Sequence, residues 1–202
     1  MPKIEEIQQY LTGAWRMMTG RPDGIRLLDI SADGFWNSFF AIAIALPALI
    51  AGWVSLTNAL SPAFLPFGDR LSIMLKLATA DIGAWIVPII AFAAVAGRSG
   101  LGDRFATYVI SSNWGSTLVF WIMLPPTLLR MFFPGLENLA TAMSLCLFII
   151  SLVLSWRLTN SALGKGPGVA TAVFAAMFIA SLAVFYALQF ALGLPALDQA
   201  TG

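Results

Sequence analysis

The chain contains no histidine among its 202 residues. Imidazole ligates haem iron, copper and most catalytic zinc, and it is the general base of Ser-His hydrolases, so its absence excludes those sites. Two membrane aspartates that share a proton could still form a catalytic pair, but only Asp81 falls within a predicted membrane span. We therefore predict that the protein is not an enzyme and holds neither a metal nor a cofactor.

Charge and cysteine are also scarce. Charged residues make up 10% of the chain and hydrophobic residues 59%, whereas a soluble protein has about 25% charged residues. The net charge is +1 and the cationic residues are spread singly along the chain, so we expect no nucleic-acid partner. The single cysteine, Cys146, lies within an apolar stretch, which predicts a small buried residue rather than a disulfide.

Long apolar stretches fill most of the sequence. A hydrocarbon core about 30 Å thick is crossed by about 20 mostly apolar residues. Stretches of that length predict five membrane-spanning helices, at residues 35–56, 75–96, 105–124, 139–156 and 169–190. The predicted fold is thus an all-α polytopic bundle of five transmembrane helices (35–192). It follows an amphipathic cytoplasmic segment (1–34) and precedes a short external tail (193–202).

The ends of some spans can also be predicted. Pro125 and Pro126 remove two backbone donors and disfavour helix before them, so we expect the third span to stop there. Residues 164–168, with the sequence GKGPG, predict the turn between the last two spans. Residues 1–34 contain several acidic side chains and no apolar core, so we expect no secretory leader and insertion directed by the first span.

The distribution of Lys and Arg predicts the orientation. In a chain with these spans, the N-terminal segment and the loops after the second and fourth spans lie on one side. That side carries Lys3, Arg16, Arg21, Arg26, Arg98, Arg104, Arg157 and Lys165, against Arg70, Arg130 and Lys76 on the other. The positive-inside bias therefore predicts a cytoplasmic N-terminus and an external C-terminus. Without a long targeting segment, the expected location is a bacterial cytoplasmic (inner) membrane.

The N-terminal segment has the spacing of an amphipathic helix. Its apolar face consists of Ile4, Ile7, Leu11, Trp15 and Met18. We expect this helix to lie on the cytoplasmic membrane surface, with Trp15 at the depth of the lipid headgroups. The alternative is that the same face packs on loops of the protein itself, and periodicity does not distinguish the two.

Small residues form a stripe on each of two spans. The stripe of the first span is Ala41, Ala45, Ala48 and Gly52, and that of the fifth is Gly168, Ala172, Ala176 and Ala180. Small side chains let helices approach closely, which drives helix association in lipid. The stripes therefore predict packing within one subunit, which is the commoner use, or the surface of a homo-oligomer.

Asp81 is the residue that most suggests a function. It is predicted to lie about 6 to 9 Å inside the outer end of the second span, where an ionisable group usually faces the bundle interior. Thr117 and Trp121 of the third span are expected level with it as hydrogen-bond donors, and Asn113 adds a further polar group to that span. A carboxyl in such a place suits the proton exchange of a carrier. The alternative is that the second span begins late and Asp81 only reaches the headgroups.

The layout resembles the Yip (Ypt-interacting protein) domain family of small multi-pass membrane proteins. The local likeness is in residues 100–108, GLGDRFATY, a short glycine-containing loop that leads into the third span through a basic residue and aromatic residues. Pro125 and Pro126 at the end of that span add to it. The resemblance implies a membrane protein of organising or trafficking type, and for eukaryotic members it implies small GTPases as partners.

Two hypotheses for function follow. The first is a non-enzymatic integral membrane protein that organises or assists others through helix contacts, with the lipid bilayer and itself or another membrane protein as partners. The second is a small oligomeric proton-linked transporter or channel that uses Asp81. The substitution Asp81→Asn separates them, because it is nearly silent under the first and abolishes a pH-dependent flux under the second.

Overall fold

The computed structural model describes residues 1–61 and 65–194, which form helices and no strand. Five helical segments are long and apolar enough to cross a membrane, which confirms the predicted all-α bundle. The first combines a short helix, α2 (Ala32–Ser38), with α3 (Ala41–Leu60). The others are α4 (Phe67–Ala96), α5 (Gly102–Phe132), α6 (Glu137–Leu163) and α7 (Pro167–Ala191), with a short 3-10 turn, η2 (Pro134–Leu136), before α6. This architecture fits an integral multi-pass membrane protein.

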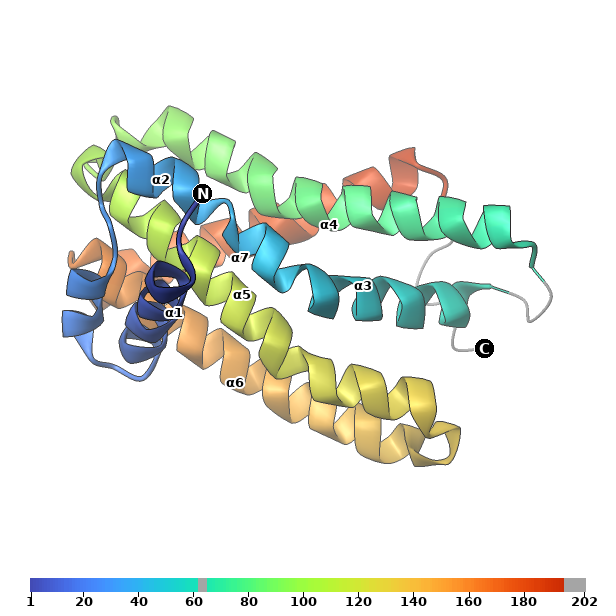
Figure 1. Cartoon of the computed structure of the whole chain (residues 1–202). Helices are drawn as coiled ribbons and strands as arrows, with labels where there is room; N and C mark the ends of the chain where they lie inside the picture. Colours follow the sequence, from blue (N-terminus) through green and yellow to red (C-terminus); the bar gives the residue numbers. More distant parts are fainter. Residues whose placement is uncertain (62–64, 195–202) are drawn as a thin grey trace.

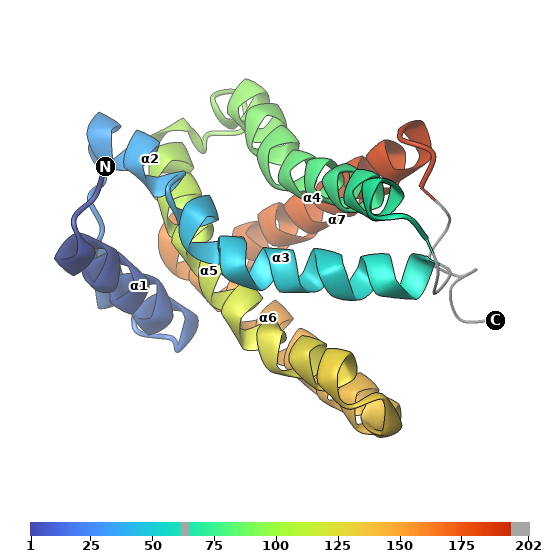
Figure 2. The same ribbon diagram turned by 45° about the vertical axis from the view of Figure 1, so that its right-hand side comes forward.

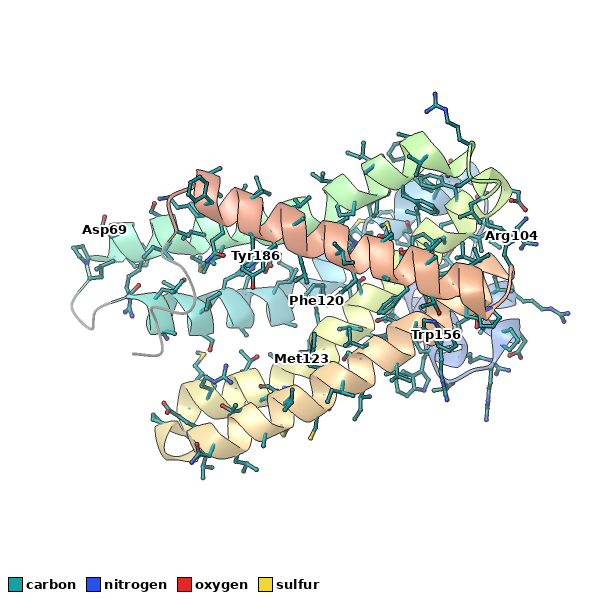
Figure 3. All side chains as sticks on the ribbon, turned by 180° about the vertical axis from the view of Figure 1, so that it is seen from behind. Asp69, Arg104, Phe120, Met123, Trp156 and Tyr186 are labelled. Atoms are coloured by element: carbon teal, nitrogen blue, oxygen red, sulfur yellow. The ribbon has the colours of Figure 1, made fainter. Side chains whose placement is uncertain are left out.

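The turns between the long helices gather at the two ends of the bundle (Figure 1). The N-terminal helix, the start of α2, and the α4–α5 and α6–α7 turns share one end, and the α5–α6 turn lies at the other. Arg104 and Asp69 accordingly lie at opposite ends (Figure 3). At the first end Lys165 Nζ lies 3.2 Å from Asp103 Oδ2, which links the α6–α7 turn to the start of α5. The segments predicted to share the cationic side therefore share one end of the bundle.

Helix α5 is central to the packing. It packs along α6 and against α3, while α4 packs against α7. Figures 1 and 2 show α5 and α6 side by side, and α3 diverging from α5 toward the end opposite α1. The α5 side chains of Ile110 and Trp114 are almost fully buried in the main hydrophobic core, together with Leu158 of α6. Gly115 allows the close approach, because a Cβ there would lie 2.5 Å from Cδ1 of Leu158. The polar residues of α5 are thus held in fixed positions by apolar neighbours.

The prediction that the third span stops at Pro125 and Pro126 is wrong, because α5 continues to Phe132. Proline is tolerated within a membrane helix where neighbouring groups hold the turn. Pro126 is fully buried, and Thr127 Oγ1 donates to the Met123 carbonyl at 3.0 Å. The predicted turn at residues 164–168 is confirmed, since α6 ends at Leu163 and α7 begins at Pro167.

The first span is not the continuous helix that residues 35–56 predict. It is interrupted at Phe39 and Phe40, where the backbone makes tighter bonds of three-residue spacing, Phe39 N to Trp36 O at 3.3 Å and Phe40 N to Asn37 O at 3.0 Å. At the same turn Ser38 Oγ donates to the Phe35 carbonyl at 2.7 Å, a local bond that competes with the helical pattern.

The N-terminal helix α1 (Ile4–Met18) and the following 3-10 helix η1 (Pro22–Leu27) pack on one end of the bundle. Helix α1 buries Tyr10, whose ring centroid lies 5.3 Å from that of Trp114. Of the predicted membrane face, Met18 is fully buried and Ile7 and Leu11 pack against the core. Ile4 and Trp15 are 72% and 45% exposed. The apolar arc is therefore divided, with one flank on the protein and the other open to the surroundings.

Two further predictions concern the single cysteine and the C-terminal tail. Cys146 is exposed on α6, so the prediction of a buried residue is wrong. On a membrane-spanning helix an apolar or weakly polar side chain needs no protein cover, because lipid surrounds it. Of the predicted external tail, residues 195–202 lie outside the described residues.

Candidate functional site

A cavity of about 290 Å³ lies among α4, α5, α6 and α7, with Met18 of α1 at its edge. Its lining combines polar and aromatic side chains. The polar ones are Asp81, Ser112, Ser116, Ser155, Thr159 and Ser181, and the aromatic ones are Trp85, Tyr108, Phe120, Phe174 and Phe178. Phe120, which Figure 3 labels, marks this region near mid-length of the bundle. A mostly apolar cavity with a few polar groups is the usual form of a small-molecule site.

Asp81 lies in the middle of α4, not near its end. The helix begins at Phe67 rather than at residue 75, so Asp81 lies about 21 Å along it at 1.5 Å per residue. The side chain is partly buried and lines the cavity. Trp53 Nε1 of α3 donates to Asp81 Oδ2 at 2.6 Å, and it is the only hydrogen bond that the described residues give this carboxylate. The geometry favours an interior carboxylate over one at the headgroups.

Several hydroxyl groups of the cavity have no hydrogen-bond partner among the described residues. Ser112 and Thr159 donate to carbonyls of their own helices, at 3.0 and 2.9 Å. Within residues 1–61 and 65–194, no hydrogen bond to another side chain or to the backbone satisfies the hydroxyls of Ser116, Ser155, Ser181 and Tyr108. Hydroxyls at such a depth in an apolar bundle normally bond to a neighbouring helix. These four are therefore available to a molecule that enters the cavity.

A buried hydrogen-bond network adjoins the cavity at the break in the first span. Trp85 Nε1 donates to Asn113 Oδ1 at 3.0 Å, and Asn113 Nδ2 donates to Ser38 Oγ at 2.9 Å. One turn further along α5, Thr117 Oγ1 donates to the Ala41 carbonyl at 2.9 Å. The network therefore joins the cavity wall, through α5, to the point where α2 ends and α3 begins.

The partners predicted for Asp81 are wrong. Thr117 donates to Ala41, and Trp121 Nε1 donates to the Ile44 carbonyl at 3.1 Å. Both acceptors are backbone carbonyls of α3, against which α5 packs, and a carbonyl oxygen has a second lone pair that can accept a bond in addition to that of its own helix. Trp53 and Trp85 were not among the site residues predicted from the sequence. The sequence could have indicated them, because the N–H of a tryptophan within a membrane span needs a hydrogen-bond acceptor, and Asp81 and Asn113 are acceptors at that depth.

The two stripes of small residues differ in their surroundings. Ala41 and Ala45 are fully buried and Ala48 nearly so, so most of the first stripe packs within the subunit. Gly52 does not take part, since a Cβ there would meet nothing within 4 Å. On α7 the stripe is largely uncovered in the structure, with Gly168, Ala172 and Ala176 exposed and Ala180 partly buried.

In the described part of the chain, no group of three or more cysteine, aspartate or glutamate side chains could hold a metal ion. Comparisons of the whole chain with protein-family models, with curated proteins and with solved structures found no match. The resemblance to the Yip family stays a prediction from the sequence, and the site has to be interpreted from its own geometry.

Proposed function

We propose that the protein is a small, non-enzymatic, proton-linked transporter that binds a solute in the cavity and exchanges protons at Asp81. The observation that carries the proposal is the cavity itself, where one carboxylate and several unpaired hydroxyls from different helices converge inside an apolar bundle. Ionisable and polar groups at this depth cost free energy, and they usually mark a solute or proton pathway. A carboxylate and hydroxyls on a single helix would not form such a site.

A local distortion of the first span is connected to the cavity wall. A single turn of 3-10 spacing lies at Phe39 and Phe40, within a segment that is otherwise long enough to cross the membrane as one helix. This turn is joined to Trp85 of the cavity wall through Ser38 and Asn113. A movement of α4 would therefore reach the break through two hydrogen bonds.

We further propose a bacterial cytoplasmic membrane, with the N-terminus in the cytoplasm and the C-terminus outside. The support is the clustering of cationic residues at the end of the bundle that holds α1, together with the positive-inside bias. In this orientation Ile4 and Trp15 of α1 would contact lipid headgroups on the cytoplasmic face.

Infrared spectroscopy of the protein in lipid vesicles tests proton exchange. We expect a carboxyl absorption that changes with pH in the unmodified protein, persists in Asp69→Asn and is missing in Asp81→Asn. Asp69 is a matched control because it lies on the same helix, is exposed and does not line the cavity. Circular dichroism and size-exclusion chromatography check that both variants fold. If Asp81 keeps one protonation state across the physiological pH range, the transport proposal fails.

A second candidate function rests on α7. The exposed stripe of Gly168, Ala172 and Ala176 would suit close contact with a second copy or another membrane protein, as in the organising role that the Yip resemblance implies. Under this candidate Asp81→Asn is silent, whereas a bulky side chain in the stripe disturbs assembly.

A further inference from the structure

We infer that the solute is a monovalent organic cation, of the quaternary ammonium or protonated amine class, which takes the place of the proton on Asp81. This inference rests on the transport function proposed above and names its substrate. Three properties of the cavity support the inference: its charge, its aromatic walls and its size.

Among the described residues, the cavity is lined by one charged side chain, and it is acidic. Of the lining residues within 1–61 and 65–194, Asp81 is the only Asp, Glu, Lys or Arg, and Tyr108 is the only other titratable group. Helices α6 and α7 contribute hydroxyl, methionine and aromatic side chains, and α3 contributes only the Trp53 indole to Asp81. Lys76 of α4 points about 140° away from Asp81 around the helix. An anion in this cavity would meet an unpaired carboxylate, whereas a cation would neutralise it.

The walls suit a soft, weakly hydrated cation. Trp85 and Phe120 lie with ring centroids 5.5 Å apart, and Phe174 and Phe178 with centroids 6.2 Å apart, and all four line the cavity. A cation over an aromatic face is attracted by the electrons of the ring, and this attraction is stronger when water is excluded. Ammonium ions with alkyl groups make this contact without losing the tight hydration shell of a metal ion.

The size of the cavity favours an organic ion over an inorganic one. At about 290 Å³ the space is near the lower end of small-molecule pockets. Small metal ions require several oxygen ligands at about 2.0 to 2.6 Å, but one carboxylate on α4 and separate hydroxyls on α5, α6 and α7 do not form such a cage. An organic cation can contact the rings and Asp81 together.

Exchange follows from the single carboxylate. A proton or a monovalent cation neutralises Asp81, and either one excludes the other, so a cation that binds to the protonated form displaces one proton, whereas a cation that binds to the ionised carboxylate displaces none. The affinity for the cation should therefore fall as the pH is lowered, because more of Asp81 is protonated. Transport of one cation against one proton moves no net charge.

Choline and its uncharged isostere 3,3-dimethylbutan-1-ol test the charge requirement, with benzyltrimethylammonium as a second, aromatic cation. Binding is measured by calorimetry on the protein in lipid nanodiscs, and released protons by an indicator in weak buffer. We expect either cation to bind at least tenfold more tightly than the alcohol and, at a pH where the infrared titration shows Asp81 protonated, to release one proton. Proton release should vanish in Asp81→Asn and persist in Asp69→Asn.

The aromatic walls have their own test. Phe178→Leu should weaken binding of the cations at least fivefold, because it removes a ring face from the cavity while keeping an apolar side chain. Phe190→Leu is the matched control, since Phe190 is on the same helix, is 88% exposed and does not line the cavity.

The outcomes separate this inference from the proposed function. Equal binding of choline and the alcohol, or no binding of either cation, overturns the organic-cation inference even when the infrared titration shows proton exchange at Asp81. Binding of the cations without proton release, at a pH where the infrared titration shows Asp81 protonated, also overturns the exchange. A silent infrared titration of Asp81 removes the proposed function itself.

Discussion

The indole Nε1 of Trp53 on α3 lies 2.6 Å from Oδ2 of Asp81 near the middle of α4. The bond joins two neighbouring helices and holds one oxygen of the carboxylate. Oδ1 receives no hydrogen bond from any described residue. Trp53 does not line the cavity, so it acts as a positioning residue that orients Asp81 without contacting the solute.

The first prediction concerns this bond. Trp53→Phe keeps an aromatic ring but leaves Asp81 without its donor, so we expect a loss of about 1.5 to 3 kcal/mol in the free energy of unfolding. In an Asp81→Leu background the same substitution should cost much less, because the acceptor is gone. Unfolding in mixed micelles measures both. Trp121→Phe is the control: it removes a donor to the Ile44 carbonyl, so it should lower the free energy of unfolding equally with Asp81 and with Leu at position 81. If Trp53→Phe also costs the same in both backgrounds, Trp53 and Asp81 are not coupled.

Asn113 carries the second prediction. Asn113→Leu removes the acceptor of Trp85 and a donor to Ser38, and we expect a loss of about 1 to 3 kcal/mol because a buried N–H is left unpaired. Hydrogen exchange should rise in residues 35–42, around the break in the first span. Thr79→Val is the control, because that hydroxyl bonds only to the Leu75 carbonyl of its own helix. Unchanged exchange at the break would contradict the role of the network.

The spans could be predicted from the sequence because length and hydropathy act locally. A run of apolar residues long enough to cross the bilayer has few alternatives to a helix. The interruption at Phe39 and Phe40 and the continuation through Pro125 and Pro126 could not be predicted in the same way. These two features depend on packing against other helices and on nearby side chains that bond to the backbone, namely Ser38 at the first and Thr127 at the second. Such contacts outweigh the conformational preference of the local sequence.

The site could be predicted only in part. Asp81, Asn113 and Thr117 were identified because polar side chains are rare in apolar spans. The partners of these side chains depend on the rotation of each helix and on its height in the bundle. The predicted second span began at residue 75, eight residues after the observed start of α4 at Phe67, so the predicted height of Asp81 was wrong. The serines of α6 and α7 carry no signal in a single helix, since only the assembled bundle brings Ser155 and Ser181 to the same cavity.

The small-residue stripes give the third prediction. Ala45→Leu should destabilise the fold by about 1 to 3 kcal/mol, because Ala45 is fully buried and a larger side chain overpacks its surroundings. Gly52→Ala on the same helix should be neutral, since the added Cβ meets nothing. Ala176→Leu should leave the stability unchanged and alter only the oligomeric state, measured by light scattering. Loss of folding in Ala176→Leu would mean that this face packs within the subunit.

The last prediction tests the proposed orientation. Cys146 is the only cysteine of the chain, so Cys146→Ser gives a background in which a single new thiol can be labelled. Ser99→Cys, between α4 and α5, and Asn138→Cys, at the start of α6, lie at exposed positions near opposite ends of the bundle. A maleimide that cannot cross membranes should label Asn138→Cys in intact cells and Ser99→Cys only after lysis. The reverse pattern would place α1 outside the cell, and Ile4 and Trp15 could then not contact lipid on the cytoplasmic face of the membrane.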